Sequence, residues 1–588
     1  MQKVGWAVSW ANEELGRQLG EIAELLKLSG ADRFRVRAYE RARDAVSAAT
    51  VDLATLRPAE LSALPGIGGS TAKKVVEFQR DGEIAMLAEL RAKVPPGVLA
   101  LIKVPGVGPK TARLLHDELG VDSLPALREA LDSGRVRGLA GLGRRTEENL
   151  RASLARVDAT ASLRTPLADV IGVAEELRSR VRALPDVGSA TLAGSYRRMR
   201  ATVKDIDLLV ATDTPAAVLR AVADDDLVRE VVATGDTKLT VRTLRDLQVD
   251  VRAVAPASWG AALVYFTGSK AHNVRIRERA LRRGVTLNEY GLFDRDSGDR
   301  VAGADEEEVY GALGLAWIPP TLREDRGEVD AAASAGLPEL VTTGALRGDL
   351  HGHSDWSGDG RASIADMAGA AGAAGLDYWA VTDHAEALAI NGLTAAQFAD
   401  RRVVLERMAG EAGVVLLDGA ELNIGLHGEL DYDDETLALF DFCVASVHTA
   451  LEKDADVQTA RIVRAMRHPA VHAIGHLTGR KLGVRPGFEV HLDQVLEVAL
   501  ETGTALEVNA SPRRLDLSDD VVRRAVDAGV TLTISSDAHT PSEIGNLRFG
   551  VGNAQRGWAT VDDVLNCREV AGVREFVAAK RARSGRRT

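Results

Sequence analysis

The hydrophobic pattern divides the chain into a helical first part and a later part in which strand and helix patterns alternate. From Glu13 to about Val157, apolar residues recur at helical spacing, and short Gly-rich turns separate the segments. From about Ala159 to Ala255 strands and helices alternate, and a short helical and hairpin region follows to about Pro320. The pattern therefore predicts helical domains ahead of a mixed α+β domain.

A second alternating region follows a charged, Ala-rich stretch from Thr321 to about Leu346. Its strand patterns are separated by Ala-rich helical segments and cover residues 378–382, 414–417, 442–446, 505–508 and 531–534. Such repetition of strand and helix is typical of a mainly parallel sheet wrapped by helices, as in an α/β barrel.

Length and composition bound the class of protein. At 588 residues the chain is longer than one hydrophobic core usually organises, so we expect about three to five compact units. No apolar run approaches the roughly 20 residues that cross a bilayer, and residues 1–12 lack the features of a secretory signal. Cys443 and Cys567 are too few for a disulfide framework. We therefore expect a cytoplasmic protein without a membrane partner.

The formal charge of −12 argues against a uniformly basic coat. It does not exclude nucleic acid, because binding depends on local fields rather than on the total charge. Two sets of arginines recur every four residues, at Arg33, Arg37 and Arg41 and at Arg275, Arg279 and Arg283. On a helix each set forms one stripe, which is either a DNA contact or a solvated face.

A Gly-rich turn recurs three times in the helical part. It reads Leu-Pro-Gly-Ile-Gly at 64–68, Val-Pro-Gly-Val-Gly at 104–108 and, more loosely, Leu-Ala-Gly-Leu-Gly at 139–143. The glycines allow a tight turn, and the helix that follows presents unpaired N–H groups to a DNA phosphate. This is the helix–hairpin–helix signature, and the predicted DNA-binding positions are Gly66, Gly68, Gly106 and Gly108.

Three carboxylates form the first candidate site. Asp205 and Asp207 stand two apart at a strand pattern and should project to the same side, and Asp250 lies in a later strand pattern. Adjacent carboxylates repel each other unless cations compensate. Three converging carboxylates suit two Mg²⁺ or Mn²⁺ ions, one beside a 3′-hydroxyl and one beside a triphosphate.

The motifs around these acids resemble the palm and thumb of family X DNA polymerases. They are Gly194-Ser-Tyr-Arg-Arg198, Asp205-Ile-Asp207, Val249-Asp-Val-Arg252 and Tyr265-Phe-Thr-Gly-Ser269. The resemblance implies that Asp205, Asp207 and Asp250 ligate the catalytic metals. It also implies that Ser195 and Arg198 hold the incoming triphosphate and that Tyr265 and Phe266 pack against its sugar, with Tyr265 as a filter against ribonucleotides. Asn273 and Arg277 would contact the nascent pair and the template, and Gly268 is a further substrate-binding position.

Some members of that family also remove a 5′-deoxyribose phosphate through a lysine Schiff base. Lys74 falls where this nucleophile would lie, shortly after the first hairpin. A supporting lysine of the animal enzyme is replaced by Ser70. Lys74 is therefore either a lyase nucleophile or a phosphate contact.

Histidine usage indicates a second site. Ten of the twelve histidines lie beyond Arg347, where an even spread would place about five. His351 and His353 stand two apart on a strand pattern, and further His or acid residues follow successive strand patterns. Ligands gather at the carboxyl ends of parallel strands, so we expect a metal centre there.

These later motifs resemble the PHP (polymerase and histidinol phosphatase) domain, which holds three metals. By that resemblance the first ion is bound by His351, His353, Glu421 and Asp537, the second by Asp359, His384 and His539, and the third by Glu421, His448 and His476. The mixed His and carboxylate ligands suit Mn²⁺, Zn²⁺ or Fe²⁺. The family usually reads Ser-Asp-Gly after His-x-His, whereas Ser357-Gly-Asp359 is one residue longer, which puts the reach of Asp359 in question. Arg480 and Arg513 are either phosphate-binding or ion-pairing residues.

We therefore expect a multidomain α+β and α/β protein that fills DNA gaps in repair and trims 3′ ends as a metal-dependent exonuclease. Gapped or primer–template DNA and deoxynucleoside triphosphates are the expected partners. The alternatives are a structural or regulatory PHP module and a PHP domain that acts on small phosphomonoesters. The predicted divisions are two helical domains at 1–90 and 91–157, a nucleotidyltransferase palm at 158–258, a thumb at 259–320, a linker at 321–345, a PHP-type (β/α)7-like barrel at 346–575 and a basic tail at 576–588.

Overall fold

The computed structural model describes residues 10–584 apart from short gaps. The gaps are residues 30, 48–52, 54–55, 64–66, 82, 94–97, 99–100, 102–103, 105–106, 140, 145, 152–153, 155–163, 335 and 389–391. The chain divides into two compact units, residues 1–164 with 483–485, and residues 165–482 with 486–588.

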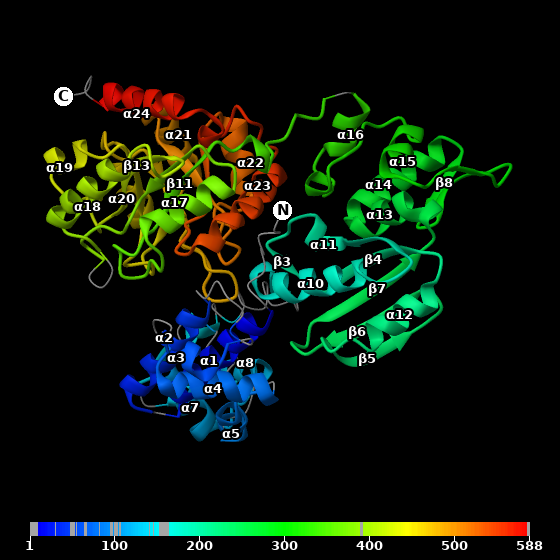
Figure 1. The fold of residues 1–588 in the computed structure, drawn as a ribbon, viewed down its shortest axis with the longest axis horizontal. Coiled ribbons are helices and arrows are strands. Elements are labelled where there is room, and N and C mark those ends of the chain that lie inside the picture. The colour runs from blue at the N-terminus through cyan, green and yellow to red at the C-terminus, as the bar shows by residue number, and fades with distance from the viewer. Residues whose placement is uncertain are drawn as a thin grey trace. The chain divides into compact units, whose positions relative to one another are not determined.

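The first unit is helical, as the pattern predicts, and is drawn in blue in Figure 1. Its described elements are α1 (Trp10–Leu28), α2 (Arg33–Ser47), α3 (Pro58–Ala63), α4 (Gly69–Asp81), α5 (Ala85–Lys93), α7 (Pro109–Leu119), α8 (Leu124–Asp132) and the 3₁₀ turn η2 (Val136–Gly138). Leu19 and Val75 belong to a core within residues 15–90. Leu115 and Leu127 belong to another core built mainly from residues 98–154.

Helices follow the first two Gly-rich turns of the first unit. Helix α4 starts at Gly69, directly after the first turn. Helix α7 starts after Gly108, with Pro109 in its first turn and no side chain capping its amides. Its first N–H groups are therefore available to an outside acceptor. Gly66 and Gly106 lie outside the described residues.

The second unit opens with a mixed five-stranded sheet in the order β2-β4-β7-β6-β5. Its elements are β1 (Thr165–Pro166), α10 (Leu167–Arg182), β2 (Val187–Leu192), α11 (Gly194–Arg197), β3 (Thr202–Val203), β4 (Ile206–Thr212), α12 (Pro215–Ala223), β5 (Val228–Thr234), β6 (Lys238–Thr243) and β7 (Gln248–Val254). Strands β4 and β7 run parallel, so their amino ends lie at the same edge of the sheet. This sheet lies within residues 158–258, for which a palm was predicted, and we call it the palm.

A smaller layer of helices and hairpins follows the palm. It contains η3 (Pro256–Ser258), α13 (Trp259–Thr267), α14 (Lys270–Arg282), β8 (Val285–Asn288), β9 (Gly291–Asp294), β10 (Arg300–Ala302), α15 (Glu306–Ala312), η4 (Pro320–Leu322) and α16 (Glu328–Ala333). Residues 321–345, predicted to be a linker, include α16, and Leu322 and Val329 join the hydrophobic core of this layer. Two arginines of the second predicted stripe bind groups of this same layer. Arg275 pairs with Asp330 at 3.1 Å, and Arg279 Nε donates to the Leu313 carbonyl at 2.7 Å.

The last part of the chain is a seven-stranded parallel sheet in the order β11 to β17. The strands are β11 (Gly348–Gly352), β12 (Tyr378–Val381), β13 (Val415–Asn423), β14 (Phe442–Ser446), β15 (Ala473–Ile474), β16 (Ala505–Asn509) and β17 (Leu532–Ser535). His353 N donates to the Ala538 carbonyl at 2.8 Å, which joins the end of the first strand to the segment after the last. The predicted (β/α)7-like barrel is confirmed.

Helices surround this barrel in Figure 1. They are η5 (Thr343–Ala345), α17 (Ile364–Ala373), α18 (Ala395–Met408), α19 (Asp434–Ala438), α20 (Ala455–Met466), α21 (Leu492–Thr502), α22 (Asp519–Ala528), η6 (Pro541–Asn546), α23 (Leu547–Arg556), η7 (Leu565–Cys567) and α24 (Val570–Ser584). The predicted basic tail contributes to this layer, because Lys580 is buried and donates to Thr504 Oγ1 at 2.7 Å.

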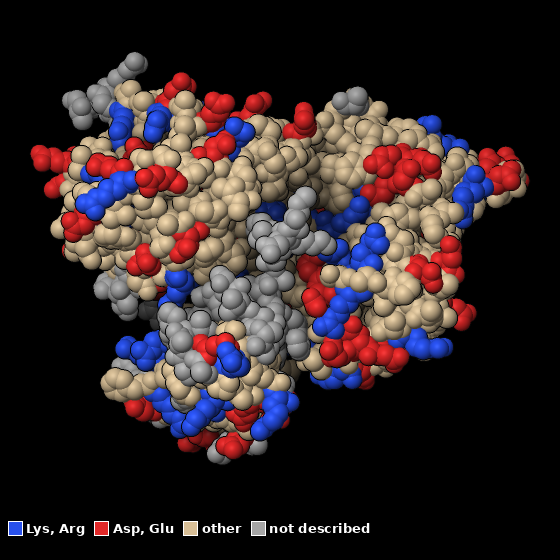
Figure 2. Space-filling view, in the orientation of Figure 1, with Lys and Arg blue, Asp and Glu red and all other residues tan. Residues whose placement is uncertain are grey.

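Charges of both signs are interspersed over the face drawn in Figure 2. This distribution agrees with a net charge of −12 and no uniformly basic coat. Among the described residues, none of the helices has the length and apolar character needed to span a bilayer.

Helix α23 of the barrel contacts the palm beside α11. Arg556 Nη1 donates to the Arg198 carbonyl at 2.8 Å and to Glu324 Oε1 at 2.9 Å, and its Nη2 donates to Asp519 Oδ2 at 2.6 Å. A Cβ on Gly552 would lie 2.6 Å from Met199 Cγ, so the helix approaches the palm closely at this point. The Arg556 side chain is only 2% exposed. The barrel therefore supports the backbone that carries Arg198.

Glu306 is the centre of a buried ion network between the palm and the layer that follows it. It accepts from Arg197 at 2.8 and 2.9 Å, from Arg323 at 2.7 Å and from Trp317 Nε1 at 3.1 Å. Burial opposes ionisation of Glu306, but Arg197 and Arg323 outweigh it and lower its pKa to about 2. Arg323 is fully buried, so it depends on this carboxylate for charge compensation.

We expect Glu306→Gln to cost about 3 kcal/mol of stability, because Arg323 would keep its charge without a full counter-ion. The loss should be read from the melting temperature of the full chain, with the exposed neighbour Glu307→Gln as the matched control. The stabilisation from a lowered carboxyl pKa is present above the ordinary value of 4.5 and is lost as pH falls toward about 2. The difference between wild type and variant should shrink over that window. Equal melting temperatures at neutral pH would contradict this account.

Candidate active sites

The three predicted carboxylates meet at one edge of the palm sheet. Asp207 on β4 is the direct register partner of Asp250 on β7, and Asp205 immediately precedes β4. Ile206 and Val249 are buried on the opposite face. The two-residue period of the strand thus separates the acids from the core residues, as the sequence predicts.

Electrostatic repulsion is strong at this edge. Burial, followed by the charges of Asp205 and Asp250, raises the pKa of Asp207 to about 7. Asp250 is oriented by Gln248 Nε2, which donates to it at 3.1 Å, and by the hydroxyl of Thr240. A carboxylate that resists ionisation among other carboxylates requires nearby cations, so this donor set fits divalent metal ions.

Helix α11 brings the Gly-Ser-Tyr-Arg-Arg motif to the same edge. Gly194 has a φ of 55°, and a Cβ there would lie 2.0 Å from Asp207 Oδ2. Glycine is therefore required for the close approach of this turn to the acids. Arg198 Nε donates to Glu324 at 3.0 Å, and its Nη1 donates to the Thr267 carbonyl.

The other predicted substrate residues lie on α13 and α14. Tyr265 and Phe266 form an edge-to-face ring pair 5.1 Å apart near the end of α13, and Gly268 is the C-cap of that helix. Asn273 Nδ2 donates to the Tyr265 carbonyl at 2.7 Å, while its Oδ1 is buried and has no hydrogen-bond partner. Arg277 is exposed on α14. These predicted substrate residues thus lie on, or at the end of, two consecutive helices, α13 and α14, and the hydrogen bond from Asn273 to Tyr265 links the two helices.

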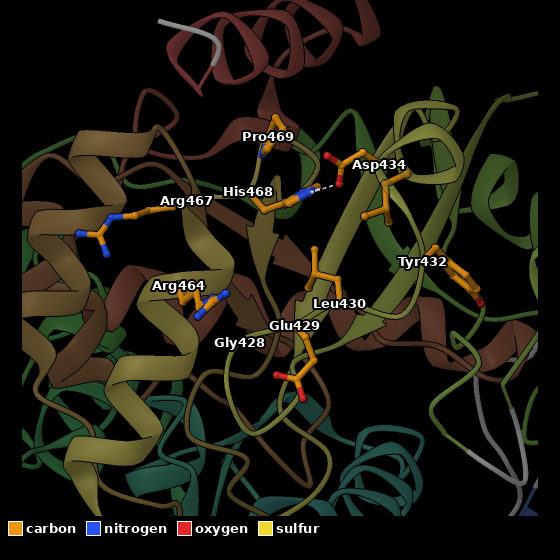
Figure 3. Close-up of a pocket in the computed structure, with 10 residues that line it drawn as sticks. Gly428, Glu429, Leu430, Tyr432, Asp434, Arg464, Arg467, His468 and Pro469 are labelled. Atoms are coloured by element: carbon orange, nitrogen blue, oxygen red, sulfur yellow. Dashed lines mark hydrogen bonds and ion pairs between the residues drawn. The ribbon is translucent and has the colours of Figure 1, made fainter. Parts of the chain in front are cut away.

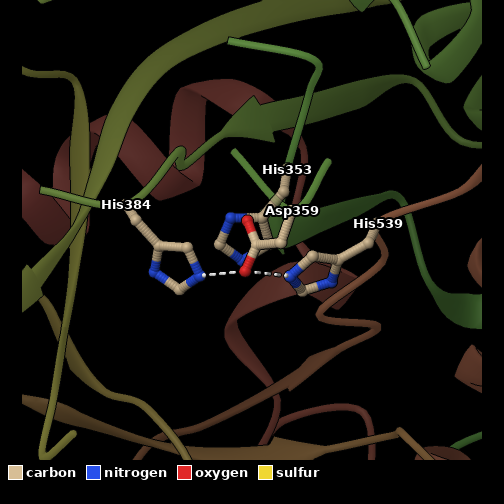
Figure 4. Close-up of side chains that lie close together, drawn as sticks. All are labelled: His353, Asp359, His384 and His539. Carbon is tan, nitrogen blue, oxygen red and sulfur yellow. Dashed lines mark hydrogen bonds and ion pairs between the residues drawn. The ribbon is translucent and has the colours of Figure 1, made fainter. Parts of the chain in front are cut away.

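The histidines and acids of the second predicted site converge inside the barrel. His351 lies on β11 and Glu421 on β13, while the others follow the ends of their strands. Three groups place ligand atoms within 4.8 Å of one another: His353, Asp359, His384 and His539; His351, His353 and Asp537; and His384, Glu421 and His448. Figure 4 shows the first group, with the Asp359 carboxylate between His384 and His539. His353 and His384 each belong to two groups, so the predicted sites adjoin one another.

Glu421 joins the groups together. Its Oε1 lies 2.9 Å from His476 Nε2 and 3.2 Å from His448 Nε2. Its Oε2 lies 2.7 Å from His384 Nδ1 and 3.5 Å from His351 Nε2, yet neither contact has hydrogen-bond geometry. Glu421 Oε2 thus lies close to two ring nitrogens without a hydrogen bond to either of them, whereas Oε1 is hydrogen-bonded to His476.

The protonation preferences of the barrel site also fit metal ions. Burial, reinforced by neighbouring imidazoles, lowers the pKa of His353 to about 4, the neutral form that binds metals. Burial opposes protonation of His384, but Glu421 and Asp359 outweigh it and raise its pKa to about 10. The carboxylates therefore require positive charge, and several ring nitrogens have no hydrogen-bond partner: His351 Nε2, His353 Nδ1 and Nε2, His384 Nδ1 and His476 Nδ1. A set of divalent ions satisfies both conditions.

Asp359 reaches the cluster despite the additional residue before it. Its Oδ2 lies 3.1 Å from His384 Nε2 and 3.5 Å from His539 Nε2. The preceding loop closes tightly, because a Cβ on Gly360 would lie 1.8 Å from the Ser354 carbonyl oxygen. Asp355, the other acid of this loop, is exposed.

Two residues that hold the barrel histidines were not predicted. Glu507 on β16 is fully buried and lies 2.6 Å from His351 Nδ1, which leaves Nε2 of that ring for a metal. Asn423 Oδ1 lies 2.7 Å from His448 Nδ1 in the same role. The sequence of β16 indicates a special role for Glu507, because this acid stands in a strand between the apolar residues Leu506 and Val508.

The remaining sequence candidates lie elsewhere. Lys74 on α4 is 19% exposed, and its Nζ lies 3.8 Å from Glu77 Oε2. Arg480 donates to the backbone carbonyls of Arg514 and Leu515, so its guanidinium is used within the fold. Arg513 is 65% exposed and pairs with Asp169 of α10 at 3.2 Å.

A separate pocket of about 370 Å³ lies between the segment after β13 and the end of α20 (Figure 3). Its charged lining residues are of both signs: Glu429, Asp434, Arg464, Arg467 and His468. His468 Nε2 lies 3.1 Å from Asp434 Oδ1. The pocket contains none of the residues predicted for either site.

Four protein-family models match parts of the chain. A helix-hairpin-helix domain matches residues 10–84, a SAM-like helix-hairpin-helix tandem 98–156, the DNA polymerase beta thumb 262–324 and the PHP domain 349–511. Fold, site and matches together define a family X DNA polymerase that carries a PHP domain.

Similarity to a single relative extends over nearly the whole chain. The DNA polymerase/3′-5′ exonuclease PolX of Bacillus subtilis (strain 168) is 36% identical over 569 residues, which cover 96% of this chain and 99% of the relative. The chain belongs to the PolX family. A probable phosphatase of Vibrio campbellii is 29% identical over 34% of this chain and 81% of its own length. Another, from Thermoanaerobacter sp. (strain X514), is 28% identical over 40% of this chain and 96% of its own length.

We expect Asp207→Asn to stabilise the metal-free protein by about 1–2 kcal/mol at about pH 8. The fold raises this carboxyl pKa from 3.8 to about 7. The cost of ionisation is therefore absent at low pH, grows as pH rises between those values and is complete above them. Melting temperatures in the presence of a chelator should show a gain that disappears toward about pH 4. A gain that does not depend on pH would contradict its assignment to the cost of ionising this carboxyl group.

Proposed function

We propose that this chain is a template-directed DNA polymerase that fills gaps during repair, and that its barrel is a 3′–5′ exonuclease. The observation that carries the proposal is the convergence of Asp205, Asp207 and Asp250 beside the Gly194 turn. It is supported by the likeness to a DNA polymerase/3′-5′ exonuclease over 96% of the chain.

In the polymerase site Asp205, Asp207 and Asp250 would hold Mg²⁺ or Mn²⁺. Ser195 and Arg198 would bind the triphosphate of the incoming deoxynucleotide. Arg198 already has a carboxylate partner, Glu324 at 3.0 Å, so triphosphate oxygens must compete with that carboxylate for its guanidinium.

The residues of α13 and α14 would select the nucleotide. Tyr265 and Phe266 would pack against its sugar beside Gly268, with Tyr265 as the filter against ribonucleotides. Asn273 and Arg277 would contact the nascent pair and the template strand. The unpartnered Oδ1 of Asn273 supports this role, because a buried acceptor without a partner gains most from a ligand donor.

In the barrel, up to three divalent ions, Mn²⁺, Zn²⁺ or Fe²⁺, would be held by the nine predicted ligands. These ligands are His351, His353, Asp359, His384, Glu421, His448, His476, Asp537 and His539. Bound ions supply positive charge beside the reacting phosphate in both sites. Glu507 and Asn423 orient two of the ligating rings.

The expected substrates are gapped or primer–template DNA and deoxynucleoside triphosphates. Gly68 and Gly108, with Gly66 and Gly106 outside the described residues, would bring helix N-termini to DNA phosphates. We infer that the protein works in the cytoplasm and associates with the nucleoid through DNA.

The two activities should be separable by single substitutions. Asp250→Ala should reduce nucleotide addition to below about 1% of wild type, because it removes metal-held charge, and should leave 3′ trimming intact. His351→Ala should do the reverse. Both are measured on one gapped duplex with a matched or mismatched 3′ end, with a small phosphomonoester as the competing substrate. Loss of both activities in a folded Asp250→Ala protein would refute separability, and cleavage of the monoester alone would favour a phosphatase.

We also propose that Lys74 forms a Schiff base with the aldehyde of an abasic site. Its position on α4 directly after the first hairpin and its partial burial support this role. The opposing feature is Glu77 at 3.8 Å, since an ion pair favours the charged amine and the nucleophile must be neutral.

Borohydride trapping on an incised abasic duplex tests the role of Lys74. We expect a covalent adduct with wild type and with Lys73→Ala, the exposed neighbour, and none with Lys74→Ala. An undiminished adduct in Lys74→Ala assigns the chemistry to another amine. No adduct with wild type means that this helix only binds the 5′-phosphate.

A further inference from the structure

Arg514 is directed at the metal-binding cluster of the barrel. Its Nε lies 3.4 Å from Asp537 Oδ2, and the other oxygen of that carboxylate, Oδ1, lies 3.2 Å from His353 Nε2. Arg514 Nη1 is buried and has no hydrogen-bond partner. The side chain as a whole is 14% exposed.

The loop that carries Arg514 is fixed by its own hydrogen bonds. Between β16 and α22, the amides of Arg514 and Leu515 both donate to the Ser511 carbonyl at 2.8 Å. Leu515 adopts a φ of 43°, a left-handed conformation that turns the chain. Asp516 accepts from the Thr478 amide and hydroxyl at 3.0 and 2.9 Å.

Arg480 fixes the loop from the opposite side. Its Nε donates to the Arg514 carbonyl at 2.8 Å, and its Nη2 donates to the Leu515 carbonyl. Because two consecutive carbonyls are held by one guanidinium, the backbone at Arg514 has little freedom. The side chain of Arg514 is therefore presented to the cluster in advance of any ligand, which lowers the entropic cost of binding.

A buried guanidinium N–H that has no hydrogen-bond acceptor favours the binding of an anion. Asp537 compensates the Arg514 charge only in part, because its Oδ2 also accepts from Asn509 Nδ2 at 3.0 Å and its Oδ1 faces His353. Arginine presents a planar fork of donors that matches phosphate oxygens. Arg513, the neighbouring residue, is exposed and paired with Asp169, so it does not compete for this position.

We propose that Arg514 is the phosphate-binding residue of the barrel site, contacting the non-bridging oxygens of the 3′-terminal phosphodiester, and that Arg480 is its positioning residue. The proposal rests on the exonuclease function proposed above. It assigns the recognition of substrate phosphate to a residue that binds no metal, beside the ligands that do.

The test compares Arg514→Gln and Arg514→Lys with Arg513→Gln as the matched neighbour. Binding of inorganic phosphate and of thymidine 5′-monophosphate to the metal-loaded full chain is measured by calorimetry. Metal content is measured by elemental analysis, and KM and kcat are measured for 3′ trimming. Nucleotide addition by each variant serves as the folding control.

We expect Arg514→Gln to weaken phosphate binding and raise KM by about 10- to 100-fold, the effect of losing a charged hydrogen-bond pair, with metal content unchanged. The phosphate affinity and KM of Arg514→Lys should lie between those of wild type and Arg514→Gln, because lysine keeps the positive charge but lacks the planar fork of donors. Arg513→Gln should resemble wild type. Arg480→Gln should lower phosphate affinity less than Arg514→Gln and leave metal content unchanged.

Two results would overturn the proposal. Unchanged phosphate affinity and KM in Arg514→Gln would mean that the guanidinium does not touch substrate. Loss of metal in parallel with phosphate binding would mean that Arg514 only supports Asp537. Failure of the exonuclease proposal has a different signature: wild type would bind phosphate in an Arg514-dependent way but would not shorten DNA.

Discussion

Concentrated negative charge at strand edges is the constraint on which both sites depend. At the palm edge burial, followed by the charges of Asp205 and Asp250, raises the pKa of Asp207 to about 7. In the barrel Glu421 lies within 3.5 Å of four imidazole rings. The palm arrangement is unfavourable for the bare protein, whereas the barrel leaves Glu421 Oε2 and several ring nitrogens without hydrogen-bond partners. The rest of each domain holds these groups in place through packing of the opposite strand faces.

The two domains meet this constraint by different means. The palm uses a single parallel strand pair, so that the register of β4 and β7 alone sets the acids opposite one another. The barrel distributes its ligands over many strands and orients them with residues such as Glu507, which is buried behind His351. Loss of one strand contact would therefore disturb the palm site more than the barrel site.

Much of this arrangement could be predicted from the sequence, because strands impose a period of two and parallel strands align their ends. The palm acids and the predicted ligands at the strand ends follow from those two rules, whereas Asp359 and the assignment of ligands to ions come from the resemblance to the PHP domain. The choice between Arg513 and Arg514 does not, since it depends on a left-handed residue in an irregular loop. The burial of Arg323 and Glu328 also could not be read from the sequence, because a charged, Ala-rich stretch normally lies in solvent. Only the partners that surround these charges explain why they are inside.

The contact of Arg556 with the Arg198 backbone has a practical consequence for dissecting the protein. A fragment cut before β11 would contain every residue expected to bind nucleotide, but it would lack the guanidinium that holds the carbonyl of Arg198 and its partner Glu324. Such a fragment would lack these contacts to its nucleotide-binding turn, even though its active-site sequence is complete. Exchange of barrels between relatives faces the same requirement: the incoming domain must supply a cation at the position of Arg556.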